Sequence, residues 1–367
     1  MAFRLEEGQD IPSSLVVALG AYRPLYEFSW AEKLCEREWA GDVKEVIIRQ
    51  ISEPLEERSL RSQITRLTPI NNKVSQSVQE QYEENPYPRW IKTGLIENGK
   101  TIGVLLAGPP HRFDLGDYKS PESPEILVAG CGTGQHALST ASRFSNARVL
   151  AIDLSLSSLS YAQRKTQELN ISNIEYAQAD IMELGTLGRQ FDLIESAGVL
   201  HHLGDPMAGW GVLVDLLRPG GLMKIGLYSA TAHQHIVAGR SFITEHGYTT
   251  TLEDIRRCRE DMIAMGEEGD QEMIKLRRNE FFSVSELRDL LFHVQEHRFT
   301  LPQIGEALHV LKLNFLGFEM RHDGPIKEFK KSYPGKDTLK SLAKWHEFEL
   351  ENPDTFIGMY QFWCRKF

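Results

Sequence analysis

Short apolar runs alternate with amphipathic stretches through the middle of this 367-residue chain. The runs most typical of buried strands are residues 126–129, 148–153, 174–182, 191–200 and 222–228. Between the second and third runs, Leu156, Leu159, Ala162 and Leu169 share one helix face, and Ser155 is placed to cap the first turn. The pattern predicts strands separated by helices.

The regions on either side of these strands follow a mainly helical pattern. Short apolar helix faces before the strands lie at residues 15–19, 30–34 and 43–48. We therefore expect a helical N-terminal extension over residues 1–110 and one domain over residues 111–367. Within that domain, a helical insertion is expected at about residues 230–307, ahead of a final strand pair at 311–320 and 359–364.

A glycine-rich loop follows the first strand, and an acid closes the second. Gly130, Gly132 and Gly134 alternate over five residues, and Asp153 stands about twenty residues downstream. Glycines at such a turn let bare backbone approach a ligand. The spacing is G-x-G-x-G rather than the dinucleotide pattern G-x-G-x-x-G, and the loop has no phosphate-binding lysine. Cys131 within it is interpreted as a small filler and not as a nucleophile.

This loop resembles the first motif of class I S-adenosylmethionine (SAM) methyltransferases. Further resemblances follow in order: Asp180 after the third strand, the segment 199–206 after the fourth, and the turn Pro219-Gly220-Gly221 before the fifth. The resemblance implies an α/β fold with a Rossmann-like seven-stranded sheet, its seventh strand antiparallel, and SAM as the cofactor. In this family, acids at the positions of Asp153 and Asp180 accept hydrogen bonds from ribose and from the adenine amino group.

The resemblance also implies a set of cofactor contacts in this chain. The expected residues are Gly130, Cys131, Gly132, Thr133, Gly134, Asp153, Leu154, Asp180, Ile181 and Ser196. The family usually has an acid two residues before the first glycine, where this chain has Val128. That departure puts the usual contact to the cofactor's amino group in doubt.

An aromatic, proline-containing segment, residues 81–90, precedes the glycine loop. Its two prolines predict an extended, stiff stretch, which forms either a rigid linker or a lid over the cofactor. As a lid, it would place Tyr82 or Tyr87 near the sulfonium, which an aromatic face attracts. Asn85-Pro86-Tyr87 also resembles the Asn-Pro-Pro-Tyr motif of amino-group methyltransferases, but it stands ahead of the glycine loop.

A competing chemistry is indicated by His293-Val294-Gln295-Glu296-His297. This H-x-x-E-H pattern is typical of inverted zinc peptidases, in which two histidines on one helix face bind zinc and the glutamate acts as base. Neighbouring leucines favour a helix here, but no third ligand is evident. A zinc hydrolase is therefore kept as a minor alternative, and no metal is assigned.

Four segments, residues 22–25, 81–90, 126–134 and 286–300, together resemble the methyltransferase module found in bacterial proteins behind tetratricopeptide repeats, although the repeats themselves are absent. The candidate catalytic residues are His201 or His202, as a base at the end of the fourth strand, and His297 from the insertion. His293, Glu296 and Arg298 are expected beside His297 on the acceptor side.

Composition limits the partners of the protein. No apolar run approaches the ~20 residues of a membrane span, and the acidic N-terminus is unlike a signal peptide, so a cytoplasmic protein is expected. The net charge of −10 does not favour nucleic acid. Two functions stay open: a methyltransferase for an unidentified small-molecule or protein acceptor, and a catalytically silent SAM-binding module. The oligomeric state is unknown from the sequence.

Overall fold

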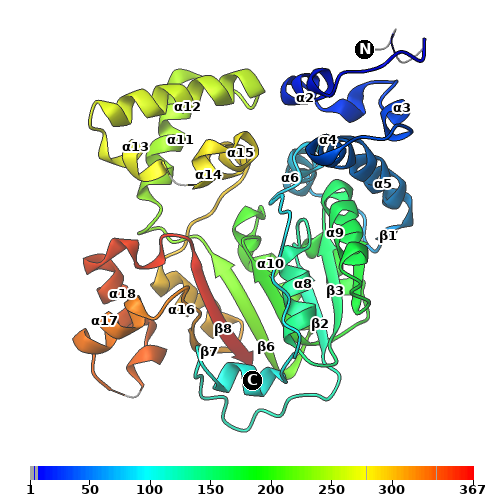
Figure 1. Ribbon diagram of the computed structural model, residues 1–367. Helices are drawn as coiled ribbons and strands as arrows, with labels where there is room; N and C mark the ends of the chain where they lie inside the picture. Colours follow the sequence, from blue (N-terminus) through cyan, green and yellow to red (C-terminus); the bar gives the residue numbers. More distant parts are fainter. Residues whose placement is uncertain (1–3, 5–6, 278, 336) are drawn as a thin grey trace.

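A computed structural model describes residues 4, 7–277, 279–335 and 337–367. Its centre is an eight-stranded sheet in the order β1-β4-β3-β2-β5-β6-β8-β7 (Figure 1). The strands are β1 (Thr65–Arg66), β2 (Glu125–Ala129), β3 (Arg148–Asp153), β4 (Ile174–Gln178), β5 (Phe191–Ala197), β6 (Leu217–Leu227), β7 (Leu313–Phe318) and β8 (Tyr360–Lys366). β8 runs antiparallel to both its neighbours, β6 and β7, and the remaining pairs are parallel.

This sheet confirms the predicted Rossmann-like α/β fold with an antiparallel last strand. The additional strand β1 comes from the N-terminal region and pairs with β4 through Thr65 and Ala177. The connection from β7 to β8 is longer than the β-hairpin of the family pattern. It carries two helices, α17 (Gly324–Ser332) and α18 (Leu342–Glu351).

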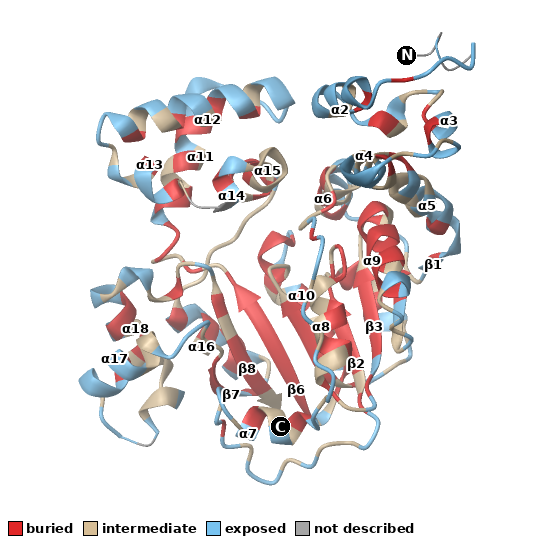
Figure 2. Ribbon diagram, viewed as in Figure 1, coloured by how far each residue is buried: buried red, intermediate tan, exposed pale blue. Residues whose placement is uncertain are grey.

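Helices cover both faces of the sheet, and each face has its own apolar core. On one face pack α10 (Pro206–Leu216), α16 (Leu301–Val310) and α18, around residues such as Trp210, Ile304 and Trp345. On the other pack α7 (Ile102–Ala107), α8 (Gln135–Arg143) and α9 (Leu156–Glu168). Figure 2 shows the central strands β2, β3 and β6 as mostly buried between these layers. Parallel strands that are covered on both faces consist mainly of apolar residues, so they can be recognised in the sequence as apolar runs.

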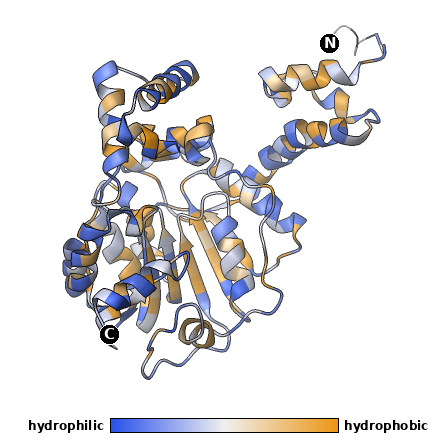
Figure 3. Cartoon of the chain, turned by 60° about the vertical axis from the view of Figure 1, so that its left-hand side comes forward, coloured by the Kyte–Doolittle hydropathy of each residue, from blue (hydrophilic) through white to orange (hydrophobic). Residues whose placement is uncertain are grey.

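The N-terminal helices form an arm with a small core of their own, visible apart from the sheet in Figure 3. They are α2 (Ser13–Tyr22), α3 (Glu32–Cys35), α4 (Gly41–Ile47), α5 (Glu53–Leu60) and α6 (Lys73–Glu84). Arg164 of α9 anchors the arm through ion pairs to Glu57, at 2.9 Å, and Glu53, at 3.1 Å. These ion pairs join the arm to the sheet domain through α5.

The helical insertion lies beyond the carboxyl ends of the parallel strands (Figure 1). It comprises α11 (Gln234–His246), α12 (Leu252–Glu267), α13 (Gln271–Leu276), α14 (Asn279–Phe282) and α15 (Val284–Phe292). These helices bury a separate apolar cluster that includes Ile255, Met262, Phe281 and Leu287. None of the described helices combines the length and apolar character that a bilayer crossing requires.

Two local predictions were wrong. The H-x-x-E-H segment is not a helix, because α15 ends at Phe292 and residues 293–298 have no regular secondary structure. His293 and His297 therefore do not share a helix face. The segment 81–90 is also not extended throughout, since α6 continues to Glu84 and only the residues after it leave the helix.

Candidate cofactor and acceptor site

A cavity of about 730 Å³ opens at the carboxyl ends of the parallel strands. The glycine loop and the ends of β3, β4 and β5 form its floor. The segment 81–90 and α6 form one wall, and the insertion forms the opposite wall. In an open α/β sheet this edge is where ligands bind. The cavity is large enough for a cofactor and part of a second molecule together.

The glycine loop is shaped by what surrounds it. Gly130 has φ +77° and Gly132 has φ +51°, and a Cβ on Gly132 would stand 2.7 Å from the carbonyl oxygen of Tyr87. Asp153 holds the loop in place: its Oδ2 accepts from the Gly132 amide at 2.8 Å and its Oδ1 from the Ser155 amide at 3.0 Å. Burial raises the pKa of Asp153. The carboxylate thus organises the loop and lines the cavity at once.

Asp180 presents a free acceptor to the cavity. Its Oδ1 caps the turn Ile181–Thr186 by accepting from the Met182 amide at 3.0 Å. Its Oδ2 is buried and has no hydrogen-bond partner among the described residues. A buried carboxylate oxygen without a partner is costly, and a ligand N–H would remove that cost. This geometry fits the exocyclic amino group of adenine.

The segment 81–90 is fastened over the glycine loop. Thr133 donates its hydroxyl to the carbonyl of Pro88, and the Trp90 indole N–H donates to the carbonyl of Thr133 at 3.1 Å. Tyr82 lines the cavity, and its hydroxyl donates to Oδ1 of Asp289 in the insertion at 2.7 Å. Residues 207 positions apart in the chain are thereby joined across the cavity.

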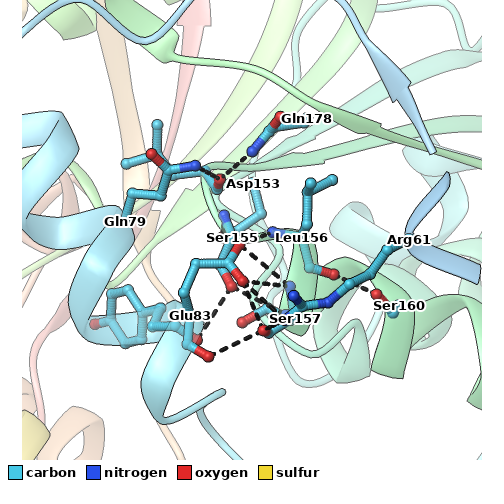
Figure 4. Close-up of polar contacts among 12 residues, drawn as sticks. Arg61, Gln79, Glu83, Asp153, Ser155, Leu156, Ser157, Ser160 and Gln178 are labelled. Carbon is cyan, nitrogen blue, oxygen red and sulfur yellow. Dashed lines mark hydrogen bonds and ion pairs between the residues drawn. The ribbon is translucent and has the colours of Figure 1, made fainter. Parts of the chain in front are cut away.

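α6 is docked on the turn between β3 and α9, as Figure 4 shows. The Glu83 carboxylate accepts from the amides of Leu156 and Ser157 and from the Ser157 hydroxyl, the last at 2.6 Å. It also pairs with Arg61 at 2.9 Å. Free amides at a helix N-terminus favour an acidic partner. This contact therefore fixes the position of α6, and with it Tyr82.

The structure brings many of the predicted site residues to the cavity. Those that line it are Gly130, Cys131, Gly132, Asp153, Leu154, Asp180, Ile181, Tyr82 and His202. Those that do not are Thr133, Gly134, Ser196, His201 and His297. Of the second group, Thr133 acts through its bond to the segment 81–90, and Ser196 is fully buried in β5.

The predicted histidines lie in a buried aromatic stack. His201 stacks on Tyr228 at 3.8 Å between ring centroids, and its carbonyl accepts from the His297 amide at 2.7 Å. His202 stacks on His293 at 3.6 Å. Burial lowers the pKa of His202 to about 4 and that of His201 well below its usual range. Both imidazoles are therefore neutral at pH 7. No group of described side chains is arranged to hold a metal ion.

The sequence did not indicate the acids on the insertion wall. Glu280, Glu286 and Asp289 line the cavity from α14 and α15. Asp289 is buried, and burial raises its pKa to about 7. The one available indication was an acid between the buried leucines of α15. In an amphipathic helix, an acid at such a position is hard to distinguish from a solvated one.

A buried acid lies beside the position where the family motif lacks one. Val128 of β2 is aligned with Glu195 of β5, and both are buried. Glu195 pairs with Arg143 at 2.5 Å and with Nε2 of His136 at 3.1 Å. Burial raises the pKa of Glu195, but the charges of Arg143 and His136 outweigh it and hold the pKa well below its usual range. His136 lines the cavity.

The sheet order, the glycine loop and the cavity are those of the class I SAM-dependent methyltransferase fold. Residues 126–221 match the model of a family described as a methyltransferase domain. The chain is similar to the structure of PKMT2 from Rickettsia typhi in complex with AdoHcy, with a TM-score of 0.52 and 15% identity. That match covers 67% of this chain and 49% of the other, so the chain spans about half the length of that protein.

A second solved structure of PKMT2 from Rickettsia typhi gives a TM-score of 0.51 at 17% identity, covering 68% of this chain and 50% of that one. Among curated proteins, the chain is 28% identical over 319 residues to an uncharacterised protein of Synechococcus. That match covers 82% of this chain and 74% of the relative. The likeness to this relative thus extends well beyond the methyltransferase region.

Proposed function

We propose that the protein transfers a methyl group from SAM to an acceptor held between the cofactor and the helical insertion. The observation that supports this proposal is one continuous cavity. It joins the glycine loop, Asp153 and Asp180 on one side to Asp289 and its neighbours in α14 and α15 on the other. A methyltransferase needs this continuity because its two substrates must meet with water excluded.

The residues present fit the cofactor. Asp153 is placed to accept from ribose hydroxyls and the free oxygen of Asp180 to accept from the adenine amino group. Tyr82 and Tyr87 present aromatic rings to the same cavity, where they favour a cationic centre. SAM, when bound, supplies an activated methyl group, and the chain supplies orientation and a place for any proton that must leave.

Among the candidate catalytic histidines, His202 is the one that lines the cavity. Its Nδ1 contacts the carbonyl oxygen of Gln295 at 2.7 Å, so its Nε2 is the nitrogen available to the acceptor. His201 and His297 support the wall behind it. We therefore assign acceptor contact to His202 and a positioning role to the other two.

The main alternative is a SAM-binding module without catalysis, which the absence of an acid at Val128 would allow. The cavity beyond the cofactor half favours the enzyme, since a module that only binds SAM needs no second compartment. A zinc hydrolase would need one helix that carries both His293 and His297, but α15 ends at Phe292. The link to tetratricopeptide-repeat proteins stays a proposal based on resemblance.

Transfer of a labelled methyl group separates the two main functions. Purified protein is incubated with SAM carrying a tritiated methyl group and a cell extract, and protein and small-molecule fractions are counted. The proposal predicts label in a defined product. Measurable SAM binding by calorimetry without any transfer would support the silent module instead. The fraction that carries the label also tells whether the acceptor is small or macromolecular.

A further inference from the structure

The acceptor half of the cavity is acidic and aromatic. Glu280, Glu286 and Asp289 line it from α14 and α15, and Tyr82, Tyr87 and Tyr228 line the same cavity. The carboxylates lie close enough to raise the pKa of Tyr87 through their charges, in addition to the effect of its burial. The six side chains therefore form one group around a common space.

Asp289 is the centre of this group. Its side chain is about nine-tenths buried, with 9% of its surface exposed. One oxygen accepts from the Tyr82 hydroxyl at 2.7 Å, and the other has no hydrogen bond to any described residue. That second oxygen belongs to a residue that lines the cavity. Within the described residues this carboxylate accepts one hydrogen bond, so a further donor or a cation would stabilise it, and the cavity is where one can enter.

Among the residues that the structure describes, the cations near these acids are engaged with other groups. Arg288, on the same helix as Asp289, pairs with Glu84 at 2.7 Å, and Arg240 of α11 faces Glu296 at 3.8 Å. Among the described residues that line the cavity, Arg321 is the only arginine or lysine, and it lies against Gly358. Burial keeps His202 and His233 neutral by lowering the pKa of each to about 4. The acceptor half therefore favours a positive ligand.

We propose that the methyl acceptor is an amine, bound as its ammonium ion by Asp289, Glu280 and Glu286, with Asp289 as the group that takes its proton. This substrate class rests on the proposed methyltransferase function. An anionic acceptor would meet three carboxylates, and a neutral alcohol would gain little from them. The aromatic rings of Tyr82, Tyr87 and Tyr228 add attraction for a cation.

The reaction balances with these groups alone. One N–H bond of the ammonium breaks, and its proton moves to the free oxygen of Asp289. The nitrogen lone pair then forms the N–CH₃ bond while the S–CH₃ bond breaks, and that electron pair stays on sulfur. The products are a methylammonium and AdoHcy. The proton leaves Asp289 for solvent past Glu280, which is exposed at the cavity mouth. A carboxyl with a pKa of about 7 is suited to this exchange.

Binding of simple probes tests amine recognition without turnover. The protein is saturated with AdoHcy, and n-butylammonium and n-butanol are titrated by calorimetry. We expect n-butylammonium to bind at least about tenfold more tightly than n-butanol, and Asp289→Asn to remove that preference. Glu260→Gln, which changes an exposed acid on α12 of the same insertion, is the matched control and should retain it. Equal binding of the two probes, or an equal loss in Glu260→Gln, would overturn the inference.

Methyl transfer provides the second test. Label from SAM should be stable to mild base and should disappear when amines in the extract are first acetylated. Base-labile label released as methanol, or label indifferent to acetylation, would overturn the amine while leaving the methyltransferase intact. Absence of any label would contradict the proposed function, and the probe titration would still decide amine recognition.

The pH profile tests the proton acceptor. Asp289→Asn should lower kcat and abolish its rise between about pH 6 and 8, with the SAM Kd unchanged. Tyr82→Phe should keep the rise but move it to higher pH, because the Tyr82 hydrogen bond lowers the pKa of Asp289. If the role of Asp289 were purely structural, its substitution would change kcat without moving the pH profile. That result would contradict Asp289 as proton acceptor.

Discussion

At the scale of single residues, the free oxygen of Asp180 gives the most direct handle on the cofactor. Asp180→Asn keeps an oxygen for the Met182 amide, so the turn that it caps should form. The amide nitrogen cannot accept from adenine, and we expect the SAM Kd to rise about tenfold. Calorimetry measures the Kd, and a thermal melt checks that the variant is folded. An unchanged Kd would show that Asp180 does not contact the cofactor.

Introducing the family's acid at position 128 should lower the stability of this protein. Val128→Asp would place a second buried carboxylate beside Glu195, whose partners Arg143 and His136 are already engaged. An unpaired buried charge costs several kcal/mol, so we expect a clearly lower Tm and no gain in SAM affinity. Tighter SAM binding at an unchanged Tm would contradict the expected repulsion between the introduced carboxylate and Glu195.

The sequence was informative for residues whose role is local. The glycine loop, Asp153 and Asp180 each lie at a strand end, and Gly130, Gly132 and both acids line the cavity. It was uninformative for Asp289 and Glu195, because their importance depends on partners far along the chain. Tyr82 is 207 residues from Asp289, and Arg143 is 52 residues from Glu195. Such pairings are set by tertiary packing.

At the scale of elements, α6 couples the N-terminal arm to the cofactor site. Glu83→Gln should weaken the contact to the N-terminus of α9 and cost about 1 kcal/mol of unfolding free energy. The SAM Kd should also rise, because α6 carries Tyr82. Glu80→Gln, at an exposed position of the same helix, is the control for loss of a charge. Denaturant unfolding and calorimetry measure the two effects, and equal behaviour of both variants would contradict the coupling.

Elements were predictable where burial on both sides gave long apolar runs, as in β2 to β6. The ends of helices were not predictable from the sequence. The H-x-x-E-H segment has helix-forming neighbours, but the chain turns out of α15 at His293, whose Nδ1 accepts from the Gln295 amide at 3.2 Å. The helices between β7 and β8 were missed because a β-hairpin was expected there. Their apolar side chains pack against α16 and the sheet.

At the scale of the whole molecule, Asp289 makes stability depend on pH. Its pKa is raised from 3.8 to about 7 by burial, so between these values the unfolded chain loses a proton that the folded chain keeps. The unfolding free energy therefore falls as pH rises from about 4 to about 7 and is level above that. Asp289→Asn removes this fall.

We expect Asp289→Asn to match the wild type near pH 4 and to exceed it by a few kcal/mol at pH 8. Urea unfolding at both pH values measures the difference. A variant that differs from the wild type by the same amount at both pH values would contradict the raised pKa. The penalty at Asp289 is one that a bound cation would relieve, which links this prediction to the amine acceptor.

We propose that one cavity brings SAM and an acceptor together for methyl transfer. Mass spectrometry of a reaction with purified protein, SAM and cell extract tests it most directly, by counting AdoHcy and methylated product together. We expect AdoHcy and methylated product to appear in equal amounts and both to be absent without the protein. Retention of SAM by the protein with no AdoHcy formed would contradict it.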